Sequence, residues 1–256
     1  MELEPKQRIL VPLDVPTVQE ADGLVEELAP FVGGFKIGLE FIYANIAQLL
    51  LSPSEKAVSL LNQLRALARR LASQRVLWDG KFADIPNTVE NASIAVSKMG
   101  VMFNVHASCG RESVRAAVKA KGSSLVFGVT VLTSIDSGEC RSIFGTEPGN
   151  KVLEFAQMLE EEQAAGIICS PQELDFLREF SLIKATPGVR PRWAAKGDQS
   201  RITTPADAVR KGADFLIIGR PIRKPPADIG GRARAARIIA EEIKAALSDL
   251  EGERRD

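Results

Sequence analysis

The sequence predicts an α/β fold, a single (β/α)8 barrel, and three observations support this fold class. Short apolar runs alternate with longer segments of helical periodicity along the whole chain, which is typical of a parallel sheet covered by helices. The apolar runs number eight, which favours a closed barrel over an open sheet. The length of 256 residues also matches the roughly 250 residues typical of such a barrel.

The eight predicted strands are rich in Val, Ile, Leu and Phe, as expected for strands buried on both faces. They cover 8–14, 34–40, 75–81, 101–107, 124–132, 165–170, 182–186 and 214–220. The predicted helices between them include 17–29, 87–99, 111–120 and 151–164. An open dinucleotide-binding sheet would require GxGxxG after the first strand, and Val-Pro-Leu-Asp-Val-Pro at 11–16 has no such motif.

The segment 41–71 is longer than one barrel helix requires. Ser52 precedes Pro53, a residue suited to the first turn of a helix, so we expect one helix to end there and a second to follow. Leucines at 60, 61, 64, 67 and 71 form a helical stripe that predicts core packing. The last helix is expected at 227–247, with a frayed, charged tail from about residue 250. We therefore predict one domain over 1–256, with an added helix within 41–73.

Composition excludes several classes of protein. Thirty-three basic residues balance thirty-three acidic ones, so no global positive field is available to hold nucleic acid. No stretch of about 18 apolar residues is present to span a membrane, and the charged amino terminus does not resemble a signal peptide. Cys109, Cys140 and Cys169 form no CxxC pair, which argues against a disulfide scaffold or a zinc ribbon and favours the reducing cytoplasm.

The predicted strands end in unusually polar residues. In a (β/α)8 barrel the active-site groups come from the carboxyl ends of the strands and the loops that follow. Buried lysine and aspartate are rare unless they are paired, so charges that converge on one barrel mouth indicate a site. The polar residues at or near strand ends are Asp14, Lys36, Asp79, Lys81, His106, Thr133, Gly219 and Arg220.

The densest cluster of charge lies within residues 79–88, Asp-Gly-Lys-Phe-Ala-Asp-Ile-Pro-Asn-Thr. Residues two apart in a strand share a face, so Asp79 and Lys81 are expected to point the same way, with Asp84 in the following turn. A lysine between two carboxylates keeps its proton, which suits a general acid and not a Schiff-base nucleophile. The alternative is a buried ion-pair network that only holds the barrel rim together.

A phosphate site is predicted at the last two strands. The loop 186–201 is long and rich in Gly, Lys and Arg, and strand eight ends in Gly219 and Arg220. Loops after strands seven and eight commonly bind phosphate in these barrels. Backbone N–H groups near Gly219 and the guanidinium of Arg220 can meet phosphate oxygens.

His106 is the only histidine, so a catalytic triad or a histidine-rich metal site is not expected. Its position allows two readings, a hydrogen-bonded residue of the strand end or a residue in contact with ligand.

Residues 79–88 resemble the DxKxxDIPNT signature of the orotidine 5'-phosphate decarboxylase family. Other segments resemble this family in the same order along nearly the whole chain. They are Leu-Asp at 13–14, Phe-Lys-Ile-Gly at 35–38, Val-His-Ala at 105–107, Val-Leu-Thr-Ser at 131–134, Thr-Pro-Gly-Val-Arg at 186–190, Gly-Asp-Gln at 197–199 and Ile-Gly-Arg-Pro-Ile at 218–222.

The resemblance implies loss of CO2 from orotidine 5'-monophosphate to give uridine 5'-monophosphate, the last step of de novo pyrimidine biosynthesis, without metal or cofactor. Lys81 would protonate C6 of the ring, Asp79 would crowd the substrate carboxylate, and Lys36 and Asp84 would complete an alternating charge array. The resemblance also implies a homodimer, with Asp84 and Thr88 reaching the neighbouring subunit's site. Substrate contacts would come from Asp14, Lys36 and Thr88 to the ribose, Thr133 to the pyrimidine, and Arg190, Gln199, Gly219 and Arg220 to the phosphate.

Two alternatives remain open. A related barrel family with a DxKxxD motif uses Mg²⁺ and acts on sugar phosphates as a decarboxylase or aldolase. The continuation Ile85-Pro86-Asn87-Thr88 and Thr133 favour the nucleotide enzyme. A catalytically silent barrel that only binds a nucleotide or a partner protein would be expected to lose a charge from the lysine–carboxylate cluster, whereas Lys36, Asp79, Lys81 and Asp84 are all present.

Overall fold

The computed structural model describes residues 3–194 and 203–253, and its centre is a closed barrel of eight parallel strands in sequence order. Pairing of β1 with β8 closes the barrel. The strands are β1 (Ile9–Pro12), β2 (Gly34–Gly38), β3 (Arg75–Phe82), β4 (Met102–His106), β5 (Leu125–Val129), β6 (Gly166–Ile168), β7 (Ile183–Pro187) and β8 (Phe215–Ile217). The predicted TIM-barrel fold class is confirmed, and each of the eight predicted runs overlaps a strand, with β3 and β7 each ending one residue later than predicted.

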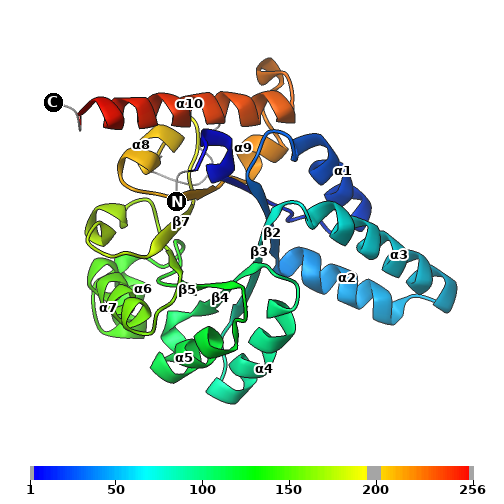
Figure 1. Cartoon of the computed structure of the whole chain (residues 1–256), viewed down its shortest axis with the longest axis horizontal. Helices are drawn as coiled ribbons and strands as arrows, with labels where there is room; N and C mark the ends of the chain where they lie inside the picture. Colours follow the sequence, from blue (N-terminus) through cyan, green and yellow to red (C-terminus); the bar gives the residue numbers. More distant parts are fainter. Residues whose placement is uncertain (1–2, 195–202, 254–256) are drawn as a thin grey trace.

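Helices form a ring around the barrel (Figure 1). They are α1 (Val18–Leu28), α2 (Leu39–Leu51), α3 (Ser54–Leu71), α4 (Pro86–Ser97), α5 (Arg111–Ala120), α6 (Ser137–Phe144), α7 (Pro148–Glu161), α8 (Pro205–Arg210), α9 (Arg220–Arg223) and α10 (Arg232–Glu253). Four short 3-10 turns, η1 (Pro5–Arg8), η2 (Ala107–Cys109), η3 (Leu174–Leu177) and η4 (Ala227–Ile229), complete the described elements. In this part of the chain, no helix combines the length and the hydropathy needed to cross a membrane.

Two helices, α2 and α3, lie side by side between β2 and β3 on the outside of the barrel (Figure 1). The predicted break is present, because α2 ends at Leu51 and Pro53 is the N-cap of α3. Leu60, Leu67 and Leu71 of the predicted leucine stripe are buried, whereas Leu61 is 42% exposed.

The last helix differs from the prediction at both ends. We expected it at 227–247, but residues 227–229 form the separate turn η4, and α10 begins at Arg232. Gly230 and Gly231 have φ values of 83° and 102°, in the region that glycine adopts without steric cost, and so separate the two elements. Helix α10 also continues to Glu253, past residue 250, where we expected the tail to begin; residues 254–256 lie outside the described part.

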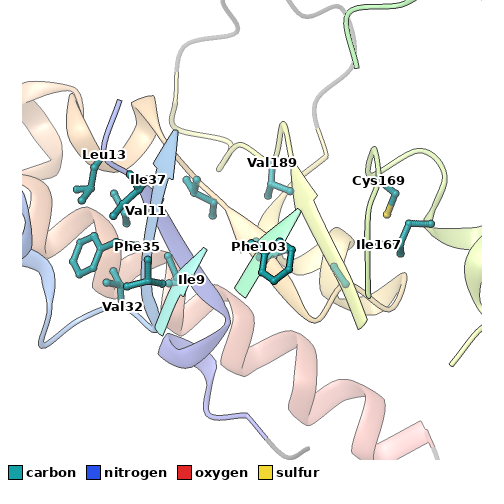
Figure 2. Close-up of a cluster of buried hydrophobic side chains, with 14 of the residues drawn as sticks. Ile9, Val11, Leu13, Val32, Phe35, Ile37, Phe103, Ile167, Cys169 and Val189 are labelled. Atoms are coloured by element: carbon teal, nitrogen blue, oxygen red, sulfur yellow. The ribbon is translucent and has the colours of Figure 1, made fainter. Parts of the chain in front are cut away.

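Side chains along each strand point alternately inward and outward, and this divides the hydrophobic core into two layers. Outward-facing residues of the strands, such as Ile9, Val11 and Phe35, pack against the helices (Figure 2). The residues between them form a separate cluster that contains no helix residue and fills the barrel interior. Its members are Leu3, Leu10, Leu77, Met102, Phe127, Ala185, Phe215 and Ile217. Because Leu3 belongs to this cluster, the segment before η1 plugs the amino-terminal end of the barrel.

Candidate active site

Four side chains at the carboxyl ends of the first three strands form a line of alternating charge. Lys36 Nζ lies 3.1 Å from Asp14 Oδ1 and 2.9 Å from Asp79 Oδ2. Lys81 Nζ lies 2.7 Å from Asp79 Oδ1. We call Asp14, Lys36, Asp79 and Lys81 the charged cluster; each of its charges meets at least one opposite charge.

Successive side chains of a strand point alternately into the barrel and out toward the helices. This alternation directs three of the four side chains to the mouth. Asp14 lies four residues after Leu10, and Asp79 lies two residues after Leu77, so both share the inward face of interior core residues. Lys36 alternates with the flanking Phe35 and Ile37, which belong to the outer core. An apolar floor and a charged mouth are therefore successive layers of one barrel interior.

Gly38 provides the space that the charged cluster occupies. A Cβ built at this position would lie 2.6 Å from Lys36 Nζ and 3.0 Å from Asp14 Oδ1. Lys36 is already held by two carboxylates, so its ammonium could move away only by lengthening those ion pairs. The glycine at the last position of β2 is thus required by the position of Lys36.

Asp79 is the most enclosed member of the charged cluster, with 9% of its side chain exposed. Burial by itself would raise the pKa of its carboxyl group. The charges and hydrogen bonds of Lys36 and Lys81 outweigh burial and hold the pKa of Asp79 below its usual value. The group is therefore a carboxylate at neutral pH.

Lys81 owes its position to an irregularity in β3. The step from Trp78 to Phe82 on β3 covers four residues, while the paired step from Phe103 to Val105 on β4 covers two. Within this bulge Lys81 has a φ of 48°, a left-handed conformation that costs a residue other than glycine roughly 1–3 kcal/mol. The expected contact between Asp79 and Lys81 is present, but the regular alternation from which we inferred it is interrupted.

Asn104, which we did not single out from the sequence, holds this bulge. Its side chain is fully buried in β4. Asn104 Nδ2 donates to Asp79 Oδ1 at 2.7 Å, and Asn104 Oδ1 accepts from the Lys81 backbone N–H at 2.7 Å. The available signal was a lone amide within the otherwise apolar run 101–105.

Arg223 of α9 is a second residue that the sequence did not indicate. Its guanidinium donates to the backbone oxygen of Asp14, and Nη2 lies 3.9 Å from Asp14 Oδ2. The helix after strand eight therefore supports the first residue of the charged cluster.

His106 lies at the end of β4 and is half-buried. Burial lowers the pKa of its imidazole, the charge of Lys81 lowers it further, and Asp79 opposes this effect. The backbone oxygen of His106 accepts from Cys109 Sγ at 2.7 Å. A neutral imidazole near Lys81 is compatible with both interpretations of His106, as a hydrogen-bonded residue of the strand end or as a residue in contact with ligand.

Asp84 and Thr88 lie on the exposed rim, outside the charged cluster. Asp84 Oδ1 accepts the N–H of Ile85 at 2.7 Å, and its backbone oxygen accepts from Ser113 Oγ at 2.8 Å. Within the described residues, no ion pair joins Asp84 to Lys36 or Lys81. Thr88 is exposed in the first turn of α4. The three-residue cluster of Asp79, Lys81 and Asp84 expected from the sequence is thus not assembled within one chain.

The predicted phosphate and pyrimidine residues lie at the ends of later strands. Gly219 is the N-cap of α9, and Arg220 is the exposed first residue of that helix. Arg190 is buried, and its backbone N–H donates to Thr203 O at 3.0 Å. Thr133 is exposed after β5. Gln199 lies outside the described residues.

The fold and the charged cluster define a class of protein, a (β/α)8-barrel enzyme with paired lysines and aspartates at its mouth. The model of the orotidine 5'-phosphate decarboxylase / HUMPS family matches residues 7–236. The chain belongs to this family.

Relatives and solved structures agree with this membership. The orotidine 5'-phosphate decarboxylase of Syntrophomonas wolfei is 39% identical, with 86% of this chain and 92% of the relative covered. That of Moorella thermoacetica is 37% identical, with 93% of each covered. The crystal structure of orotidine 5'-phosphate decarboxylase from Lactobacillus acidophilus has a TM-score of 0.71 at 26% identity and covers 92% of this chain and 98% of that one.

Proposed function

We propose that the charged cluster is the centre at which this protein decarboxylates orotidine 5'-monophosphate. The reaction gives uridine 5'-monophosphate and CO2, and it is the last step of de novo pyrimidine biosynthesis. One observation carries the assignment to these residues. In a member of this family, Asp14, Lys36, Asp79 and Lys81 meet at the barrel mouth in an alternating line with contacts of 2.7–3.1 Å.

Lys81 is the proposed proton donor. When the bond between C6 and the carboxylate carbon breaks, its electron pair stays on C6 and CO2 leaves. The Lys81 ammonium then transfers a proton to C6, and the lysine regains one from solvent. A fixed cation next to the carbon that gains negative charge stabilises the transition state without reorganisation, which is commonly the largest catalytic contribution. Asp79, 2.7 Å from Nζ, orients the ammonium group.

Asp79 has a second proposed role, toward the carboxylate that leaves. Because its pKa is held below the usual value, Asp79 is ionised when substrate binds. A fixed carboxylate next to the substrate carboxylate raises the energy of the bound substrate, and the repulsion ends when neutral CO2 forms. Binding energy from the distant phosphate can offset this cost.

The rest of the nucleotide is assigned to the polar residues around the mouth. Asp14 and Lys36, with Thr88, bind the ribose hydroxyls, and Thr133 faces the pyrimidine. The phosphate is assigned to Arg190, Gln199, Gly219 and Arg220. Exposure of Arg220 at the start of α9 supports this role, because an exposed guanidinium can bind phosphate oxygens in pairs. Arg220→Ala is expected to weaken both binding and turnover.

We infer that the active form is a homodimer in which Asp84 and Thr88 enter the partner's site. Asp84 is charged, exposed and separate from the charged cluster of its own chain. The adjacent Ile85 is 65% exposed, and Ile94 of α4 is 42% exposed, as expected for a surface that a partner covers.

Mixing two inactive variants tests this arrangement. A dimer of one Lys81→Ala subunit and one Asp84→Ala subunit contains one site with both native residues if Asp84 acts across the interface. Activity should then return after refolding a mixture of the two variants. If Asp84 acts within its own chain, every site lacks one residue and activity stays lost, which would contradict the shared site.

The activity itself is tested by following the ultraviolet absorbance of orotidine 5'-monophosphate with purified protein and a strong chelator. Turnover under chelation supports decarboxylation without a metal ion or cofactor. Activity only toward sugar phosphates and only with Mg²⁺ would instead assign the chain to the other activity considered from the sequence. No activity in either assay would indicate a binding protein.

We place the protein in the cytoplasm. Cys109, Cys140 and Cys169 are all free thiols, as a reducing compartment would keep them.

A further inference from the structure

We propose that Asn104 is a positioning residue that sets the geometry of both Asp79 and Lys81 for the decarboxylation. This inference rests on the proposed function. Asn104 reaches no reacting atom, because its side chain is fully buried and both of its polar atoms already have partners within the site. It acts through the two residues that it bonds.

The two hydrogen bonds of Asn104 have opposite directions. Toward Asp79, which is a carboxylate, Asn104 must donate, and it does so from Nδ2 to Oδ1 at 2.7 Å. Toward the backbone N–H of Lys81 it must accept, and it does so at Oδ1, also at 2.7 Å. A carboxamide is the short side chain that offers a donor and an acceptor at fixed separation. An ionised aspartate offers only acceptors, and leucine of similar size offers neither.

The bond to Asp79 orients its carboxylate. Oδ1 accepts from both Asn104 and Lys81 Nζ, which leaves Oδ2 directed at Lys36, 2.9 Å away. A carboxylate with three fixed donors cannot rotate without breaking at least one charged contact. Asn104 is the one neutral donor among the three, so it orients Asp79 without competing for the charge of either lysine.

The bond to Lys81 holds its unfavourable backbone conformation. The N–H of Lys81 points to Asn104 from within the bulge in β3, where the regular ladder to β4 is interrupted. A residue at φ 48° keeps that conformation only when its surroundings impose it. Asn104 supplies the hydrogen-bond partner that the interrupted ladder lacks at this point, and so holds Lys81 where its ammonium group contacts Asp79.

The Asn104→Asp variant tests the two hydrogen bonds separately, because it keeps one of them and removes the other. The new group can still accept from the Lys81 N–H, but when ionised it cannot donate to Asp79 and instead repels it. We expect kcat to fall roughly 100-fold near neutral pH, as an ångström-scale displacement of a catalytic group would cause. The dissociation constant of uridine 5'-monophosphate should change less than about threefold.

The pH profile of Asn104→Asp distinguishes positioning from general damage. A protonated carboxyl group can donate to Asp79 as the amide does, so part of the lost kcat should return as pH falls from about 8 to about 6, with the two carboxyl groups sharing one proton. Wild-type protein should show no such rise. Asn104→Leu, which removes both bonds and has no group to protonate, should lose kcat at every pH.

Asn45→Asp is the matched control. Asn45 is also buried, at 3% exposure, and its Nδ2 donates to Phe41 O at 2.7 Å within α2, away from the charged cluster. This variant should keep the wild-type kcat and pH profile even if it lowers stability. If Asn104→Asp fails to fold, Asn104→Ser is measured in its place, with the same expected loss of kcat at retained product binding.

Two results would overturn the inference while the proposed function stands. An active wild type together with Asn104 variants within about threefold of its kcat would show that the bonds do not matter to the reaction. Equal losses of product binding and kcat, with no recovery at acidic pH, would show a merely structural role. An inactive wild type would instead refute the proposed function, and this inference with it.

Discussion

The two ends of the barrel both carry partly buried cations, but the groups that contact these cations differ. At the carboxyl end, Lys36 and Lys81 contact carboxylates at 2.7–3.1 Å. At the amino end, Arg8 Nη1 donates to the backbone oxygens of Ala213 and Asp214 at 3.3 and 3.4 Å. Arg75 donates to Gln7 O at 3.2 Å and lies 5.0 Å from the centre of the Phe215 ring.

The difference separates the end that we propose to be reactive from a structural end. Burial lowers the pKa of both arginines, and for Arg8 the charge of Asp214 opposes this effect. A guanidinium stays charged under any ordinary condition, so backbone carbonyl groups and a ring can serve as its contact partners. Lysines and aspartates in close contact form a preorganised field that a substrate can use, and Lys81 keeps 30% of its side chain exposed. A groove of about 1270 Å³ also lies at the amino end, between η1 and α10, but the charged cluster is at the opposite end.

The strongest test of this comparison is Lys81→Ala. Removing the proposed proton donor should lower kcat by roughly 10⁴-fold or more, while uridine 5'-monophosphate still binds and the free energy of unfolding changes little. Steady-state kinetics, product titration and urea denaturation measure the three quantities. Near-normal turnover would rule out Lys81 as the donor.

Phe215→Ala tests the structural end. Phe215 is 1% exposed in the barrel interior, so truncation should lower the free energy of unfolding by about 4 kcal/mol through the cavity that it leaves. The value of kcat/KM for the folded variant should match that of the wild type. If kcat/KM fell tenfold or more in protein that urea denaturation shows to be folded, the two ends would not be independent.

Glu173 sharpens the comparison because it is a buried carboxyl group that pairs with no lysine among the residues that the structure describes. It follows β6, is 8% exposed, and its Oε2 accepts the N–H of Ser170 at 2.8 Å. Burial raises its pKa to about 7, opposed only by that hydrogen bond. Asp79 has the opposite shift because two ammonium groups outweigh the burial.

Glu173→Gln should therefore change how stability depends on pH. Between about pH 4.5 and 7 the folded state holds a proton that the unfolded state has released, so the free energy of unfolding of the wild type falls as pH rises through this window. Glutamine does not ionise, so the variant does not lose stability in this way as pH rises. The variant should be more stable than the wild type by about 3 kcal/mol near pH 8 and equally stable near pH 4. A difference that is independent of pH in urea denaturation would contradict the assignment.

Gly38→Ala is expected to have the smallest effect. The new methyl group would displace Lys36 Nζ, which lies 2.6 Å from the Cβ position, and we expect kcat/KM to fall roughly tenfold. Gly23→Ala is the matched control, since a Cβ at Gly23 in α1 meets no atom within 4 Å. The control should keep full activity and gain about 0.5–1 kcal/mol of stability. Equal activities of the two variants would show that space at Gly38 is not limiting.

Much of the site could be predicted because it depends on the position of each residue in its own strand. Asp14, Lys36 and Asp79 were identified as polar ends of apolar runs, and parallel strands bring such ends to one mouth. Asn104 was not identified, because its role depends on the pairing of β4 with β3, 25 residues earlier. Arg223 was missed for the same reason, since it meets Asp14 209 residues away.

The sequence by itself determined the order of strands and helices and the polar character of the strand ends, because periodicity and strand-end chemistry are local properties of the chain. Only the tertiary structure decided how these ends meet. The register between β3 and β4 produced the bulge, the bulge placed Lys81 in a left-handed conformation, and Asn104 became its partner. The tertiary structure also left Asp84 on the rim, apart from the lysines of its own chain. Each of these outcomes depends on contacts between segments distant in the sequence, which local patterns do not record.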